Sequence, residues 1–157
     1  MLKALKKRYL GYTFKSDRIN TLVSHDLGYR QIFKYQFWSD PDNIYVNNFY
    51  DDRKIKLLHI SDSINYELVK YSILDCGEEH LNKYKEYLEI YFRNYNIDEV
   101  LDKKLNMMKS IRETGNINSY CIMDVRRSNS SSKVVLLDGA HRAAAAFALS
   151  LKIAIRF

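Results

Sequence analysis

The stretch that most constrains the fold is "VVLLDGAHRAAAA", residues 134–146. A run of four apolar residues without alternation is typical of a strand that is buried on both faces. The four alanines at the other end favour a helix, because alanine has the highest helix propensity. Asp138 and Gly139 stand between the two. The sequence therefore predicts a tight turn from a buried strand into a helix, which is an α/β arrangement.

The flanking segments extend this pattern to a small mixed α/β (α+β) domain. Ser63 and Gly115 are typical start and stop residues of helices. We expect further strands at 54–60, 119–125 and 152–157, and further helices at 64–74, 78–95 and 98–114. The strand–helix–strand order at 134–157 predicts a right-handed crossover beside a mixed sheet. Residues 76–104 are predicted to be a helical insertion.

The first 50 residues are predicted to be an N-terminal extension, followed by the main domain at 51–157. A turn around Pro41, the one proline of the chain, separates the two. Residues 1–18 hold six Lys or Arg and one Asp, so five of the six net positive charges lie there. This basic first helix could contact a membrane surface, an acidic partner or RNA, or it could dock on the domain with solvated lysines. The near-neutral body does not favour nucleic-acid binding.

The cysteine content and the hydropathy of the sequence indicate the compartment in which the protein works. The two cysteines, Cys76 and Cys121, are far apart and form no CxxC pair. We therefore expect buried or free thiols, not a disulfide scaffold or a zinc site. No stretch approaches the about 20 apolar residues of a membrane span, and the N-terminus lacks the apolar region of a secretory signal. The sequence predicts a soluble, cytoplasmic protein.

The turn between the predicted strand and helix brings several polar residues together. Gly139 permits a tight bend and close approach by a ligand, and a helix that starts at Ala140 would direct unpaired N–H groups toward an anion. Arg142 adds a forked cation suited to phosphate. His141 can move a proton near neutral pH, and Asp138 can cap the helix, bind a metal ion or act as a base. In the alternative, Asp138 is only a cap, His141 bonds a backbone group, Arg142 pairs with a structural carboxylate and Gly139 serves only the turn.

Residues 108–157 resemble the second half of the ParB/sulfiredoxin-like domain. The shared pattern is a helix ending in glycine, a strand, a second strand ending in Asp-Gly-x-His-Arg, a helix of small residues and a short last strand. Residues 55–73 resemble the opening strand and helix of that domain more loosely. The resemblance implies a bacterial-type domain in which the turn from Gly139 to Arg142, including Ala140, holds a nucleotide phosphate.

Departures from the family pattern narrow what the resemblance implies. Sulfiredoxins need a cysteine directly after the glycine, where this chain has Ala140. Partition proteins continue into DNA-binding and dimerisation domains, whereas this chain stops at Phe157. The free-serine kinase branch is nearest in motif, but it uses a glutamate just after the first strand. Here the candidates for that role are Asp62 and Glu67.

Two functions remain open at this point. One is a kinase-like phosphotransferase or nucleotide hydrolase that uses ATP, ADP or CTP with Mg²⁺. Asp138 would hold the metal, His141 would assist proton transfer, and Asp62 or Glu67 would be the base. The other is a non-catalytic module that binds a nucleotide or a phosphorylated metabolite, and a DNA-binding or nuclease role is less favoured. If Asp62 or Glu67 points at the Gly139 turn, the enzyme is favoured. If the side of the site facing that turn has no carboxylate, the binding module is favoured.

Overall fold

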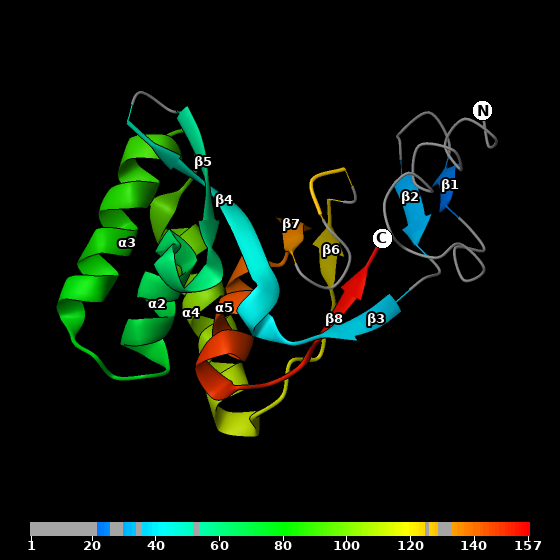
Figure 1. Ribbon diagram of the computed structural model, residues 1–157. Helices are drawn as coiled ribbons and strands as arrows, with labels where there is room; N and C mark the ends of the chain where they lie inside the picture. Colours follow the sequence, from blue (N-terminus) through cyan, green and yellow to red (C-terminus); the bar gives the residue numbers. More distant parts are fainter. Residues whose placement is uncertain (1–21, 26–29, 34–35, 52–53, 125, 129–132) are drawn as a thin grey trace.

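A six-stranded mixed sheet with helices gathered on one side forms the main body of the computed structural model (Figure 1). The structure describes residues 22–25, 30–33, 36–51, 54–124, 126–128 and 133–157. The strands of this sheet are β3 (Gln36–Ser39), β4 (Ile44–Tyr50), β5 (Lys54–His59), β6 (Cys121–Met123), β7 (Val134–Asp138) and β8 (Ile153–Arg156). The helices are α2 (Ile64–Ser72), α3 (Glu78–Tyr91), α4 (Ile97–Thr114) and α5 (Ala140–Leu149).

Short elements complete the described chain. Strands β1 (Leu22–His25) and β2 (Arg30–Phe33) pair antiparallel in a separate two-stranded sheet. The 3-10 turns η2 (Pro41–Asn43) and η3 (Ile60–Asp62) lead into β4 and α2. The basic helix expected in residues 1–18 lies outside the described residues. No helix in the described part of the chain is long and apolar enough to cross a lipid bilayer.

The strand order confirms the predicted α/β class but corrects one connection. The order is β3-β8-β6-β7-β4-β5, with β4 parallel to β7 and β6 parallel to β8. Because β6 is antiparallel to β7, strands β7 and β8 run in opposite directions with β6 between them. The predicted crossover from β7 through α5 to a parallel neighbour is therefore wrong. The reason is that β6 takes the place beside β7, which leaves β8 to pair with β6 and β3.

The predicted division at residue 50 falls between two paired strands. β4 pairs antiparallel with β5 along most of its length and parallel with β7 at Ile44 and Tyr45. β3 pairs with β8 at the other edge of the sheet. Residues 36–50 are thus part of the same sheet as the later strands. Their inclusion is physically required, because without β4 the strand β5 would have no partner.

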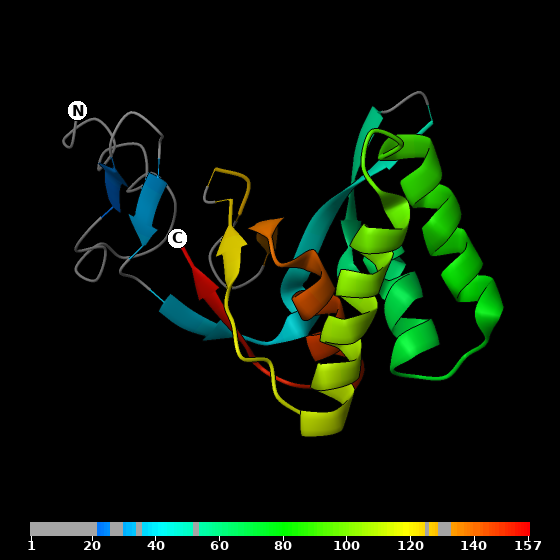
Figure 2. The ribbon, with the colours of Figure 1, turned by 180° about the vertical axis from the view of Figure 1, so that it is seen from behind.

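Helix α5 lies between the sheet and the other helices, as Figures 1 and 2 show from opposite sides. It contacts α2, α4 and β6. The four alanines Ala143–Ala146 are all fully buried. Their small side chains let α5 approach both layers closely, which large residues would prevent. The alanine-rich middle of α5 is therefore buried between β6 and the helices α2 and α4, and its first turn is half-buried.

Candidate functional site

The turn after β7 is held by close packing against β6. Gly139 has φ +91°, a left-handed conformation, and it is the N-cap of α5. A Cβ atom at this position would lie 2.5 Å from Cys121 Sγ and 2.9 Å from Cys121 Cα. The Cys121 thiol donates to the carbonyl of Gly139 at 3.2 Å. Glycine is therefore needed both for the conformation and to make room for the neighbouring strand.

The two thiols have the environments expected of structural or free cysteines. Cys121 is buried and Cys76 is exposed, and neither is in a disulfide. Burial raises the pKa of Cys121 to about 12, although Arg142 acts in the opposite direction. The thiol that lies against the turn is therefore protonated at neutral pH and is a poor nucleophile.

Arg142 and Asp138 lie on the same side of the turn. Asp138 is exposed and its Oδ2 lies 3.4 Å from Arg142 Nη2. Asp138 precedes the N-cap residue, and no side chain caps the start of α5. Arg142 Nε is buried and meets no nitrogen or oxygen acceptor in the described part of the chain, although the guanidinium lies close enough to the Cys121 thiol to oppose the rise in its pKa. The guanidinium thus contacts the exposed carboxylate of Asp138 through Nη2, whereas its Nε lies on the buried side.

Arg142 lines a pocket of about 220 Å³ between the end of α4 and the loop that precedes β6. The Arg142 pocket is lined by Met107, Ser110, Ile111, Asn116, Ile117, Asn118, Ser119 and Arg142. Its polar lining groups are hydroxyls, amides and one guanidinium, with no carboxylate among the described lining residues. Such a set favours an anion, because neutral donors and a cation can both bind it.

His141 lies on a different side of the α5 first turn and ends a chain of hydrogen bonds. The backbone N–H of Ile64 donates to Asn48 Oδ1 at 2.8 Å. Asn48 Nδ2 donates to Asn65 Oδ1 at 3.3 Å. Asn65 Nδ2 then lies 3.2 Å from His141 Nε2, and Tyr84 Oη lies 2.6 Å from the same nitrogen. Four side chains from β4, α2, α3 and α5 are connected in this way.

This chain fixes the orientation of the two amides beside His141, and burial keeps the ring neutral. A backbone N–H can only donate, so Asn48 must present its oxygen to Ile64 and its NH₂ group to Asn65. Asn65 must then present its own NH₂ group to the His141 ring, where Nδ2 lies 3.2 Å from Nε2 and 3.5 Å from Nδ1. Burial, with further effects of Lys104 and Arg142, lowers the pKa of His141 to about 3. His141 is consequently neutral at pH 7 and does not titrate near neutrality.

The two carboxylates considered as bases are not brought to the turn. Glu67 lies 2.6 Å from His80 Nδ1 and 2.7 Å from Lys70 Nζ. Burial alone would raise the pKa of Glu67, but the hydrogen bonds with His80 and Lys70 bring it below its usual value. Asp62 is exposed at the end of η3, where the Ser61 hydroxyl lies 3.5 Å from it. Neither lines the Arg142 pocket or the cavity beside His141.

The cavity beside His141 has a volume of about 290 Å³ and lies between β4 and the helices α2, α3, α4 and α5. The residues with polar side-chain groups that line this His141 pocket are Asn47, Asn48, Asn65, Tyr84, Tyr87, Lys104 and His141. Sequence reasoning identified His141 but missed the others. Tyr84 has the helical spacing of a core residue of α3, and it is 2% exposed, yet its hydroxyl reaches His141. No local spacing could have connected Asn48, Asn65 and Lys104, because they come from three different elements.

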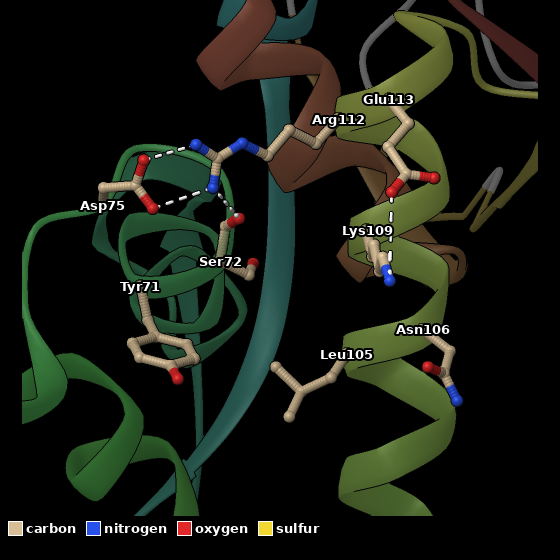
Figure 3. Close-up of a pocket in the computed structure, with 8 residues that line it drawn as sticks. All are labelled: Tyr71, Ser72, Asp75, Leu105, Asn106, Lys109, Arg112 and Glu113. Carbon is tan, nitrogen blue, oxygen red and sulfur yellow. Dashed lines mark hydrogen bonds and ion pairs between the residues drawn. The ribbon is translucent and has the colours of Figure 1, made fainter.

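A larger surface groove, of about 710 Å³, lies between α2 and α4 (Figure 3). Figure 3 shows Arg112 reaching from α4 to the carboxylate of Asp75 and the carbonyl of Ser72. Lys109 is 3.9 Å from Glu113 on the same helix. The charged side chains of this groove are already paired, so it presents no unsatisfied charge to a ligand.

The described residues do not provide a set of side chains that could hold a metal ion. They contain no group of three or more His, Cys, Asp or Glu side chains arranged to hold one. Asp138 is the expected metal ligand, but its nearest charged neighbour is the Arg142 guanidinium. A cation in that place disfavours Mg²⁺, which is usually bound by carboxylates and phosphate oxygens. The residues at the turn therefore do not fit a magnesium ion held by the protein alone.

Comparison of the chain with protein-family models, with curated proteins and with solved structures finds no match. The resemblance to ParB/sulfiredoxin-like domains thus rests on the residues of the turn and the order of the elements around it.

Proposed function

We propose that this protein is a non-catalytic module that binds a phosphate-bearing small molecule, such as a nucleotide, at the start of α5. The observation that carries the proposal is that Arg142 is the one charged residue among the described residues that line a pocket without carboxylates. Its ion-pair partner in the described part of the chain, Asp138, is exposed and lies 3.4 Å away. A phosphate in the pocket would bring compensating negative charge to the guanidinium.

Two further features support phosphate as the ligand. The start of α5 has no side-chain cap, so the positive end of its helix dipole lies at the residues just before Arg142, although Ala140 itself lines the cavity beside His141. Ser110, Asn116, Asn118 and Ser119 add neutral hydrogen-bonding groups around the same pocket. The Asp-Gly-x-His-Arg resemblance to ParB/sulfiredoxin-like domains points to the same ligand chemistry. Any Mg²⁺ would accompany the phosphates of the nucleotide rather than belong to the protein.

The binding role is favoured over phosphoryl transfer because the expected base is missing from the turn. Glu67 is engaged by His80 and Lys70, and Asp62 is exposed away from both pockets. His141 is neutral, and its Nε2 is already occupied by Tyr84 and Asn65. A transferase would need a group to orient or deprotonate the acceptor, and none of these side chains is free for that role.

The test is a thermal-shift panel with ATP, ADP, CTP and GTP, each with Mg²⁺, on the wild type and on Arg142→Met. A ligand at 100 times its Kd stabilises the folded state by about 2.7 kcal/mol. For a chain of this size that raises Tm by about 5–10 °C. Methionine retains the apolar stem of the arginine but removes the guanidinium, so the shift should disappear. Arg93→Met, which removes an exposed arginine beyond α3, should retain it.

Two results would count against this proposal. An equal shift in Arg142→Met would move the phosphate away from the Arg142 pocket. The absence of a shift with every nucleotide and with inorganic phosphate would reject a phosphate ligand. Incubation of a bound nucleoside triphosphate with the wild type should release no phosphate, and steady release would instead support the phosphotransferase or hydrolase.

A further inference from the structure

We propose that the His141 pocket is a second binding site and that it takes a compact aromatic carboxylate. This inference does not rest on the phosphate site, because it concerns another cavity and another cation. The pocket has a volume of about 290 Å³. Since a water molecule occupies about 30 Å³ in the liquid, the pocket has room for about ten waters, or an organic molecule of similar size.

The charge inside the pocket is positive and uncompensated. Lys104 is half-buried and, with His141 neutral, it is the one charged residue among the described lining residues. By contrast, Lys103, the preceding residue, pairs with Glu99, and Lys70 of α2 pairs with Glu67. Lys104 has no hydrogen bond or ion pair to any residue in the described part of the chain. A partly desolvated ammonium without a counter-ion is unfavourable, so an anionic ligand would be stabilised there.

The position of Lys104 relative to the polar chain supports the same conclusion. Its charge is one of the causes that lower the pKa of His141, so the ammonium lies close enough to act on the imidazole. Asn47 and Asn65 line the same pocket, and each has N–H capacity left: Asn47 accepts from Arg127 through its Oδ1, and Asn65 directs one N–H group toward His141. These neutral groups can hydrogen-bond the oxygens of an anion without adding negative charge.

Aromatic rings form the apolar wall of the pocket. Phe49, Tyr87 and Phe92 line it, with ring centroids 5.9 Å apart for Phe49–Phe92 and 5.9 Å apart for Tyr87–Phe92. Tyr87 is fixed in place because its hydroxyl accepts from the backbone N–H of Phe49 at 3.0 Å. A preformed aromatic wall favours a flat ring in the ligand, since aromatic rings pack well edge-to-face or offset.

The single lysine favours a carboxylate over a phosphate. One ammonium compensates one negative charge, and no second cation lines the pocket in the described part of the chain. The groups that suit a phosphate, namely the Arg142 guanidinium and its surrounding donors, line the other pocket. A monovalent carboxylate on an aromatic ring therefore satisfies the charge, the hydrogen-bonding groups and the wall together.

The experiment measures binding of benzoate, 4-hydroxybenzoate and phenylacetate by isothermal titration calorimetry, with benzamide and phenyl phosphate for comparison. Benzamide has the shape of benzoate without its charge. We expect at least one carboxylate to bind with one-to-one stoichiometry, and benzamide and phenyl phosphate to bind at least about tenfold more weakly. Lys104→Met should weaken carboxylate binding at least about tenfold, and Lys104→Arg should restore it to within about threefold of the wild type.

Lys109→Met is the matched control, because Lys109 is an exposed lysine of the same helix whose partner is Glu113. It should bind the carboxylates like the wild type. Unchanged affinity in Lys104→Met, tighter binding of phenyl phosphate than of every carboxylate, or no binding of any of the three carboxylates would each overturn the proposal. Rescue by Lys104→Arg separates a lost charge from a loss of folding.

Discussion

Replacing Gly139 with alanine tests whether the turn depends on close packing against β6. The substitution adds one methyl group at a residue with φ +91°. That methyl carbon would lie 2.5 Å from Cys121 Sγ and 2.9 Å from Cys121 Cα. The second contact is with backbone, so rotation of the thiol cannot relieve it. Either β6 or the start of α5 must move.

The expected cost has two parts. A left-handed conformation costs a residue with a Cβ atom about 1–2 kcal/mol. Forcing an extra carbon into a packed interior typically costs about 1–3 kcal/mol more. Gly139→Ala should therefore lower the free energy of unfolding by about 2–5 kcal/mol, which is a large share of the stability of a typical domain.

Gly115→Ala supplies the comparison that isolates the packing. Gly115 is also left-handed, with φ +62°, but a Cβ atom there would meet nothing within 4 Å. It should lose only the conformational part, about 1–2 kcal/mol. The loss of unfolded-chain entropy that accompanies any Gly→Ala change is common to both variants and cancels. Urea unfolding gives both values, and equal costs within about 0.5 kcal/mol would refute the packing argument.

Two further predictions follow from the titration of buried groups. Between pH 6.5 and 3 the unfolded chain protonates at His141 while the folded protein does not, so the stability that this residue contributes above pH 6.5 should be lost as pH falls through that window. The slope is up to about 1.4 kcal/mol per pH unit, and His141→Gln should remove it from urea unfolding measured at several pH values; an unchanged slope would contradict the argument. A thiol reagent at pH 8 should label exposed Cys76 rapidly and leave buried Cys121 unmodified until the protein unfolds, so rapid labelling of Cys76→Ser would be inconsistent with the described packing.

Features determined by local sequence could be predicted. The turn from β7 into α5 follows from the contrast between an apolar run and an alanine run on either side of Asp138 and Gly139. Ser63 caps α2 with its side chain, and Gly115 ends α4 in the left-handed conformation, as predicted. These signals work because each involves hydrogen bonds within a few residues of the chain.

Features determined by distant partners could not be predicted. β3 and β4 lie in a segment for which the sequence predicts an extension, because the turn at Pro41 resembles a boundary. Asn48 is 6% exposed, which is unusual for an amide in a strand. It is tolerated there because its oxygen and its NH₂ group are both satisfied by residues of α2. That compensation has no signature in the residues around Asn48.

The same compensation makes Asn48 the residue that controls the protonation of His141 from a distance. In Asn48→Asp one carboxylate oxygen can still accept from the N–H of Ile64, but the other can no longer donate to Asn65. Asn65 must then turn its amide so that its NH₂ group faces the introduced carboxylate and its oxygen faces His141. The Asn65 oxygen and the introduced carboxylate then favour the imidazolium, and the pKa of His141 should rise from about 3 toward its ordinary value. Nitrogen-15 chemical shifts of the imidazole would report both the tautomer and the titration, and a titration identical to that of the wild type would show that the amide chain does not set the state of the ring.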